Sequence, residues 1–193
     1  MMGDMTSDPD TIKLTHHSSS ATRPMLDTLC LVYADAYEVE PTQEKTGAFR
    51  ARTERGLERA GFELVMAAVG EELVGFAFGY PIPEGNTAWW QGLDPEPPEG
   101  FTVETGTRTF ILAEIEIRRA WQGRGVGRRV HDELLAGRLE ERATLATNPD
   151  ASRSHAIYEA WGWRRIGRIP GKPGDYFGAY ELFLRPLSND ASR

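Results

Sequence analysis

Residues 110–138 join an apolar run, a glycine-rich turn and a helical pattern, and no other stretch constrains the fold as strongly. The run 110–117 (FILAEIEI) is apolar except for Glu114 and Glu116, which predicts a buried strand with two carboxylates on one face. Four residues later comes the turn QGRGVG, and apolar side chains then recur at helical spacing from Val126 to Leu135. The sequence therefore predicts a strand, a tight turn and a helix in direct succession.

The turn between this strand and helix is typical of an anion-binding site. Glycines let the backbone approach a ligand, the N–H groups of a first helical turn lack helical partners, and the helix dipole favours negative charge there. Arg124 and Arg128 add positive charge. The spacing of Gly123, Gly125 and Gly127 fits neither the dinucleotide fingerprint nor the nucleoside-triphosphate loop. We therefore expect the pyrophosphate of another ligand, and the alternative is a tight turn with no ligand.

The pattern Q-x-x-G-x-G, beginning at Gln122 after a strand that ends in Ile-Glu-Ile, resembles the coenzyme A loop of the GNAT N-acetyltransferase superfamily. A second stretch, YEAWGW at 158–163, is similar to the family's Y-x-x-x-G-[FW] motif at the end of its last helix. The resemblance covers roughly residues 62–187. It implies acetyl-CoA as the acyl donor, an N-acetyltransferase activity and direct transfer in a ternary complex.

The resemblance also implies which residues contact the cofactor. They come from the end of the strand, the glycine turn and the region of the last helix: Ile115, Glu116, Ile117, Gln122, Gly123, Arg124, Gly125, Val126, Gly127, Arg128, Asn148, Ser154 and Tyr158. Tyr158 matches the tyrosine that the family uses as general acid for the coenzyme A thiolate. The sequence departs from the family at Ala151, where an asparagine often bonds the pantetheine arm, and at Ala146, where some members carry a base glutamate.

A base is required because an alkyl ammonium, with a pKa of about 10.4, must lose its proton before it attacks a thioester. Glu114 sits where many family members carry a strand glutamate, so it is the first candidate and Glu116 the second. Burial of a carboxyl group raises its pKa towards a useful value. The alternative is that either carboxylate only pairs with Arg118, Arg119 or an arginine on a helix.

Residues 81–106 contain five prolines and four glycines around Trp89 and Trp90, which predicts a long loop. One interpretation is a lid whose two indoles contact the acceptor substrate. The alternatives are a contact in a homodimer and a packed surface loop. The acceptor itself is expected to be a small-molecule or protein amine.

The remaining patterns give an element order of β-α-α-β-β-β-α-β-α-β-β. This order fits the α/β fold that the resemblance implies, a mixed, mostly antiparallel sheet with helices on both faces. Strands are predicted at 11–15, 62–69, 73–80, 110–117, 143–147, 164–169 and 179–184, and helices at 23–37, 43–60, from 126 onwards and at 151–160. We expect a single domain over 11–187, between a flexible N-terminal tail at 1–10 and a C-terminal tail at 188–193.

Composition excludes several classes of function. A net charge of −7 argues against a nucleic-acid partner, because no basic stripe remains outside the glycine turn. No apolar run approaches 18 residues and the N-terminus lacks a signal-peptide layout, so neither a membrane partner nor secretion is expected. A single cysteine, Cys30, fits a reducing compartment, and we predict a cytoplasmic location. The four histidines lack metal spacing, so no metal is expected, and His131 and His155 are predicted to be exposed.

Two rival functions stay open. One is an acyl-CoA-binding regulatory or interaction module without turnover, which the alanine at position 151 favours. The other is an acyltransferase that uses a different acyl-CoA or an oxygen acceptor.

Overall fold

A computed structural model describes residues 11–173 and 175–187 and gives an α/β fold; the two predicted tails lie outside the described residues. The strands are β1 (Lys13–His17), β2 (Glu63–Val69), β3 (Glu72–Pro81), β4 (Thr109–Ile117), β5 (Arg142–Thr147), β6 (Arg164–Pro170) and β7 (Ala179–Pro186). The helices are α1 (Ser19–Thr22), α2 (Leu26–Tyr37), α3 (Glu44–Leu57), α4 (Val126–Leu135) and α5 (Ser152–Ala160). Apart from the one-turn helix α1, which the sequence did not predict, the element order is the predicted one.

Hydrogen-bonded neighbours follow the strand order β1-β2-β3-β4-β5-β7-β6. The pairs β1–β2, β2–β3, β5–β7 and β6–β7 are antiparallel, whereas β4 and β5 run parallel. The predicted fold class, a mixed and mostly antiparallel sheet with helices, is confirmed. The chain groups into two units, one with residues up to Gly79 and Glu114–Ala136, the other with Tyr80–Ala113 and the residues from Gly137 onwards. The single domain expected over 11–187 stays a prediction.

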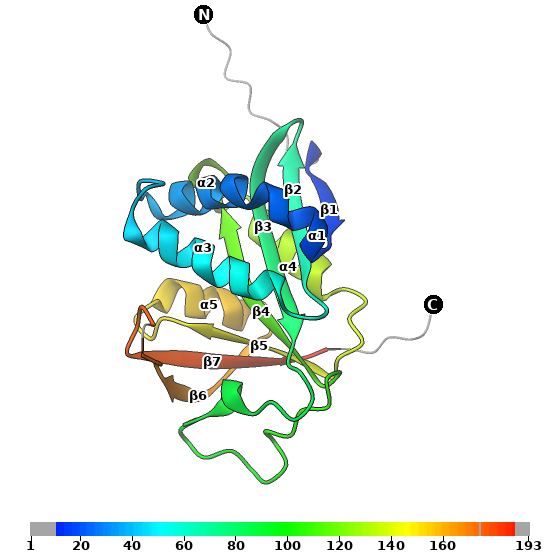
Figure 1. Ribbon diagram of the computed structural model, residues 1–193, viewed down its shortest axis with the longest axis vertical. Helices are drawn as coiled ribbons and strands as arrows, with labels where there is room; N and C mark the ends of the chain where they lie inside the picture. The colour runs from blue at the N-terminus through cyan, green and yellow to red at the C-terminus, as the bar shows by residue number, and fades with distance from the viewer. Residues whose placement is uncertain (1–10, 174, 188–193) are drawn as a thin grey trace, which may run out of the picture. The chain divides into compact units, whose positions relative to one another are not determined.

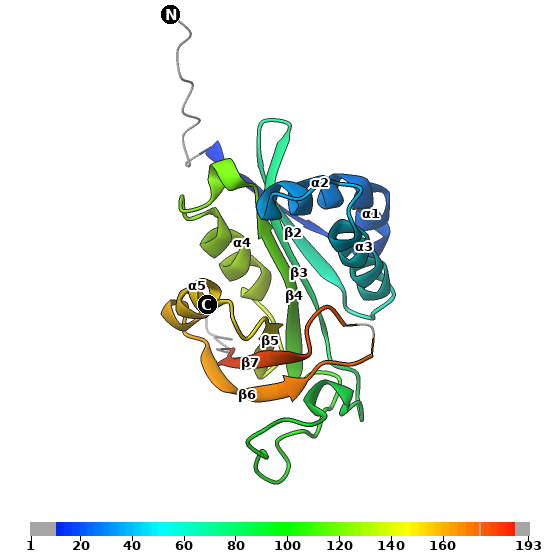
Figure 2. The same ribbon diagram turned by 90° about the vertical axis from the view of Figure 1, so that its left-hand side faces the viewer.

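In the first unit, helices cover both faces of the strands. Figure 2 shows α1, α2 and α3 on one side of β2 and β3, and α4 on the other side. The side of α2 and α3 is packed by aromatic residues: the rings of Tyr33 and Phe49 stack with centroids 4.3 Å apart, and Phe49 in turn lies against Phe76 of β3.

Two glycines of the first unit provide a matched test of its packing. A Cβ added at Gly75 in β3 would overlap the Ile117 side chain and lie 3.0 Å from the Glu116 carbonyl oxygen, whereas one added at Gly47 in α3 would meet nothing within 4 Å. We expect Gly75→Ala to lower the free energy of unfolding by about 1–3 kcal/mol, because β4 would have to shift. Gly47→Ala is expected to raise it by about 0.5–1 kcal/mol through helix propensity. Urea unfolding of both variants checks the result, and changes of the same sign would contradict it.

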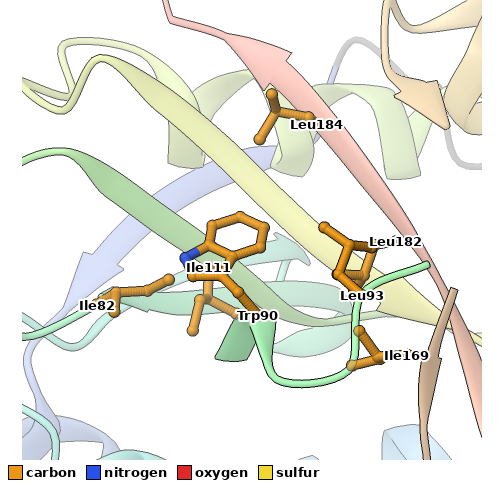
Figure 3. Packing of buried hydrophobic residues seen from close by; sticks show 7 residues of the cluster. All are labelled: Ile82, Trp90, Leu93, Ile111, Ile169, Leu182 and Leu184. Carbon is orange, nitrogen blue, oxygen red and sulfur yellow. The ribbon is translucent and has the colours of Figure 1, made fainter. Parts of the chain in front are cut away.

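In the second unit, a helix covers one face of the strands and an irregular segment covers the other (Figure 1). Phe183 of β7 faces α5, where its ring lies 5.4 Å from that of His155 and 6.0 Å from that of Tyr158. Its neighbours Leu182 and Leu184 point to the opposite face, since side chains alternate along a strand. They belong to a buried cluster with Ile82, Trp90, Leu93, Ile111 and Ile169, which Figure 3 shows from close by.

Residues 82–108, here called the proline-rich segment, are attached to β6 by backbone contacts. The Asp94 N–H donates to the Arg168 carbonyl at 2.9 Å, and the Arg168 N–H donates to the Asp94 carbonyl at 2.8 Å. Gly92 lies close to the Pro170 ring, where an added Cβ would be 2.8 Å from a ring carbon. The segment therefore packs along strand β6 of its own unit, and its role as a lid or as a contact in a homodimer stays a prediction.

A buried carboxylate in the proline-rich segment joins Trp90 to strands β4 and β5. The Glu104 Oε1 atom accepts hydrogen bonds from Trp90 Nε1 at 2.9 Å, from Thr109 Oγ1 at 2.8 Å and from Arg142 Nη2 at 3.1 Å. The Glu104 side chain has no exposed surface and that of Arg142 is 9% exposed. Burial, together with the positive charge of Arg108, lowers the pKa of Arg142. Trp90 is thus held in two ways: its ring packs in the buried cluster, and its N–H group donates to Glu104.

Candidate functional site

The glycine turn connects β4 to α4 within the first unit. A short 3₁₀ helix, Arg119–Trp121, follows β4, and Gly123 and Gly125 then adopt φ angles of 73° and 82°. Side chains are strained at such angles, so both positions favour glycine. Gly125 is the N-cap of α4, and a Cβ added at either glycine would meet nothing within 4 Å. The turn therefore leaves open space beside the N-terminus of this helix.

The start of α4 presents backbone donors and positive charge. The N–H groups of a first helical turn have no partner within the helix, and α4, all of whose residues are described, carries no side-chain cap and no acid in its first turn. Arg128 Nε donates to Asp132 at 2.6 Å, so this cation is already paired. The Arg124 guanidinium lies 5.4 Å from the Trp121 ring centroid and has no carboxylate partner in the described part of the chain. Arg124 is therefore the cation best placed to meet an anion at the turn.

The predicted cofactor residues Ile115, Glu116 and Ile117 form the end of β4. The register of β4 with β5 covers Thr109–Ile111 and Arg142–Thr144, and it includes none of these three residues. Gln122 folds back on the same strand: its Nε2 atom donates to the Ile117 carbonyl at 3.0 Å. Its side-chain amide thus stabilises the turn, while its contact with a cofactor stays a prediction.

The two strand carboxylates lie on one face, as the sequence predicted, and an arginine from α3 reaches the first of them. Arg52 Nε donates to Glu114 Oε1 at 2.9 Å, with 40% of the arginine side chain and 14% of the glutamate side chain exposed. Glu116 is more deeply placed, with 5% of its surface exposed. The alternative that a helix arginine pairs with one of the carboxylates is therefore confirmed for Glu114; the expected partners Arg118 and Arg119 instead pair with Glu72 and Glu38.

Burial and neighbouring charges shift the pKa values of side chains at and around the two strand carboxylates. Burial raises the pKa of Glu116 well above its usual range, and the charge of Glu114 adds to the effect. Burial also raises the pKa of Tyr33 to about 12. For Arg52, burial disfavours the charged form, but the neighbouring Glu114 outweighs it and the pKa is raised. The two carboxyl groups therefore differ: burial favours the neutral form of Glu116, while Arg52 is bonded to Glu114.

Sequence reasoning missed Arg52, which reaches Glu114 from α3. Arg52 lies 62 positions before Glu114, on a helix whose pattern is that of any charged, solvent-facing surface. No local signal distinguishes it from Arg50 or Arg55 on the same helix. Only the packing of α3 against the strands brings Arg52, rather than Arg50 or Arg55, into contact with Glu114.

The remaining predicted site residues lie in the second unit, around α5. Tyr158 is half-buried, and its ring lies edge-on to those of Trp161 and Trp163 at centroid distances of 6.1 and 6.3 Å. Ser154 is half-buried one turn earlier on the helix. Asn148 Oδ1 accepts the backbone N–H of Asp150 at 3.0 Å, so this side chain shapes the turn before α5.

The two tryptophans predicted to contact the acceptor are both used in packing. Trp90 is buried, and Trp89 Nε1 donates to Thr144 Oγ1 at 3.2 Å. A cavity of about 550 Å³ opens on the proline-rich segment and includes Trp90, together with Gly85, Asn86, Thr87, Ala88, Gln91 and Thr102, in its lining. A contact of either indole with a substrate stays a prediction.

The expectation that His131 and His155 are exposed was wrong. Both are buried. The His155 Nε2 atom bonds the Asn148 carbonyl at 2.9 Å, and its Nδ1 atom lies 3.1 Å from an Arg165 nitrogen. A histidine is apolar enough to pack when both ring nitrogens have partners, which sequence spacing does not reveal. Within the described ranges, no group of three or more His, Cys, Asp or Glu residues could hold a metal ion, and no helix is long and apolar enough to cross a membrane.

Comparison with known proteins gives a family match over most of the chain. The model of the acetyltransferase (GNAT) family matches residues 26–163, a range that begins at α2 and so includes Arg52 as well as the glycine turn. A GCN5-like protein acetyltransferase of Mycobacterium tuberculosis is 34% identical over 105 residues. That alignment covers half of this chain and half of the relative.

Solved structures with the same fold have much lower sequence identity. A protein assigned to the GNAT family from Desulfovibrio desulfuricans is 14% identical, with a TM-score of 0.65 over 92% of this chain and 99% of its own. A GNAT family acetyltransferase from Elizabethkingia anophelis with acetyl-CoA bound is also 14% identical, with a TM-score of 0.59 over the same shares of the two chains. At such identities the similarity establishes the fold alone.

Proposed function

Because the chain belongs to the acetyltransferase (GNAT) family, a family of acyltransferases, we propose that it transfers the acetyl group of acetyl-CoA to a primary amine, by direct transfer in a ternary complex. The observation that carries the proposal is the glycine turn. It leaves open space at the N-terminus of α4, directly after the strand that holds two carboxylates. An anion site and a proton acceptor next to each other in the chain are what the reaction needs.

The residues of the turn fit the pyrophosphate of coenzyme A. Gly123 and Gly125 allow the backbone to approach the ligand, and the first-turn N–H groups and Arg124 supply donors and positive charge. Farther back, the end of β4 can offer backbone groups to the amide-rich pantetheine arm. When bound, acetyl-CoA supplies a thioester carbonyl that an amine can attack.

The proton steps fall to side chains of this chain. Glu114, the more exposed member of the carboxylate pair, accepts the proton of the acceptor ammonium directly or through water, so that the neutral amine can attack. Tyr158 donates a proton to the departing thiolate, which has a reference pKa of about 8.5 against about 10 for the phenol. Its role rests on the motif YEAWGW at 158–163.

Coenzyme A binding is tested by thermal unfolding with acetyl-CoA, using NAD and ATP as controls. A ligand at a hundred times its dissociation constant adds about 2.7 kcal/mol to stability, so we expect a clear rise in Tm with acetyl-CoA alone. Arg124→Gln should reduce this rise, because the cation beside the turn is lost. Arg55→Gln, which removes an exposed arginine from α3, is the matched control and should leave it unchanged. Folded protein that gives no shift with acetyl-CoA would contradict the proposal.

Tyr158→Phe is expected to lower turnover by about a hundredfold or more while the affinity for acetyl-CoA is nearly unchanged, since only the acidic proton is removed. Steady-state rates, together with the thermal shift at several acetyl-CoA concentrations, separate the two effects. Unchanged turnover at saturating substrate would exclude Tyr158 as the acid.

The acceptor class is tested by the release of free coenzyme A with a panel of amines. The Mycobacterium tuberculosis relative is described as a protein acetyltransferase, so lysine-containing peptides belong in the panel beside small amines. Binding of acetyl-CoA without release from any amine would favour a regulatory module instead. Faster release with longer acyl chains or with alcohols would favour the second alternative, an acyltransferase of different specificity. A cytoplasmic location, which the single buried Cys30 fits, completes the proposal.

A further inference from the structure

A histidine of strand β1 has a carboxylate at each of its two ring nitrogens. His16 Nδ1 lies 2.6 Å from Glu63 Oε1 of β2, and His16 Nε2 lies 2.8 Å from Glu133 Oε1 of α4. All three residues belong to the first unit. The reaction proposed above uses none of them, so the contact needs an explanation of its own.

The chemistry of the two contacts indicates the charge of the ring. A neutral imidazole has one N–H donor and one acceptor nitrogen, whereas an imidazolium has two donors, and an ionised carboxylate can only accept. In a neutral His16 ring, one nitrogen would therefore face a carboxylate oxygen with a lone pair. An imidazolium donates to both Glu63 and Glu133, which is the arrangement that the distances fit.

Helix α4 contacts β1 at two points. Glu133 reaches His16, and Arg129, one turn earlier on the helix, donates from Nη2 to the Ile12 carbonyl at 3.2 Å. The contacted positions on the strand side are also four residues apart. Among the described strands β1 pairs with β2 alone, so the contacts with α4 are a second attachment for this edge strand.

The other groups close to His16 in the chain do not face its ring. Lys13 and His17 lie on the opposite face of β1, because side chains alternate along a strand, and His17 Nε2 bonds Thr15 Oγ1 on that face at 2.9 Å. The pairing partner of His16 on β2 is the apolar Val65. The four residues of α1 (SSAT), all of them described, include no titratable side chain.

We propose that His16, held as an imidazolium by Glu63 and Glu133, is a pH-sensitive clamp that fastens the edge strand β1 to helix α4. In the charged state each ring N–H donates to one carboxylate. When the ring releases a proton to water, one donor remains, so one of the two hydrogen bonds is lost together with the attraction between opposite charges. Deprotonation therefore loosens the contact of β1 with its surroundings.

The direction of the pH dependence follows from the contacts. The hydrogen bond to Glu133, and next that to Glu63, raise the pKa of His16 above its ordinary value of about 6.5, and they outweigh the opposing effect of burial. The clamp is thus fully formed below about pH 6.5 and is lost as the pH rises through the higher folded-state pKa. Its effect on stability is small, because the three side chains are 44%, 30% and 42% exposed.

The charge of the ring can be measured by NMR. In ¹⁵N-labelled protein the His16 imidazole, identified by its loss in His16→Gln, should be protonated at both nitrogens at about pH 5.5 and titrate with a midpoint above about 6.5. Glu133→Gln and Glu63→Gln should each lower this midpoint, because each removes one anion. Glu71→Gln, in the exposed turn after β2, is the matched control and should leave it in place. A wild-type midpoint at or below about 6.5, or one that fails to fall in either variant, would overturn the proposal.

Hydrogen exchange tests whether the charged ring holds the strand. At about pH 5.5 the β1 amides should exchange faster in His16→Gln than in the wild type, by up to about fivefold, the size expected for exposed ion pairs. The difference should vanish at a pH well above the midpoint, and β7, in the second unit, serves as the internal control. Equal exchange of β1 in the two proteins at low pH would overturn the clamp. Neither measurement uses a substrate, so the outcome is independent of the function proposed above.

Discussion

Glu114→Gln is expected to lower kcat/KM for acetyl transfer at neutral pH by roughly a hundredfold or more, which is within the usual range for removal of a general base. The amide has nearly the shape of the carboxylate but cannot accept the ammonium proton. The loss should shrink as pH rises, because a growing fraction of the acceptor amine is already neutral. A pH series of kcat/KM with one acceptor measures this directly.

Two further substitutions make this result specific. Glu71→Gln, in the exposed turn between β2 and β3, removes the same charge from a residue outside the predicted site and should leave the rate unchanged. Glu116→Gln changes the more deeply buried carboxyl group, the second candidate for the base, so its loss should be smaller than that of Glu114→Gln. If Glu116→Gln alone shows the large loss that diminishes with rising pH, then the base is Glu116 and the order of the pair is reversed.

The fold was largely predictable from the sequence because its signals are local. The strand 110–117, the glycine turn and the following helix each carry their own pattern, and the structure has them at Thr109–Ile117, Gly123 to Gly125 and Val126–Leu135. The largest boundary differences are three residues each: the first predicted helix begins at Leu26 rather than 23, and the second ends at Leu57 rather than 60. Helix ends are set by caps and packing over a single turn, so they are less well determined by periodicity.

The site was predictable only where its residues are neighbours in sequence. Glu114 and Glu116 share a face because a strand has a period of two, and that follows from the sequence alone. Arg52 belongs to the same group through a contact between α3 and β4 that no local pattern encodes. The buried state of His131 has the same cause, since it depends on what α4 packs against.

The proline-rich segment shows the same limit. Its composition predicted a loop, but the sequence could not choose among a lid, a dimer contact and a packed surface. Nor could it show that Glu104, one of several acids in this stretch, is buried, because Trp90, Thr109 and Arg142 meet at one of its oxygens only in the folded chain. Contacts between residues far apart in the sequence thus bury a carboxylate that the local sequence would place on the surface.

Glu104→Ala is accordingly expected to be the most destabilising single substitution proposed for this chain. It leaves Arg142 buried without its anion and removes the acceptor of two further hydrogen bonds. Breaking a buried ion pair from one side costs about 3–5 kcal/mol, and for a chain of this size that lowers Tm by roughly 10 °C. Thermal and urea unfolding of the variant measure both quantities.

A surface pair in the same unit serves as the matched control. Glu141 lies 3.5 Å from Arg108 and is mostly exposed, so Glu141→Ala should change stability by at most about 1 kcal/mol. The double variant Glu104→Gln/Arg142→Met should be more stable than Glu104→Ala, because the uncompensated cation is gone and the methionine can still pack against Trp90 and Phe101, the rings that Arg142 now covers. A loss in Glu104→Ala no larger than that in Glu141→Ala would mean that the hydrogen bonds of the Glu104 carboxylate do not hold the proline-rich segment in place.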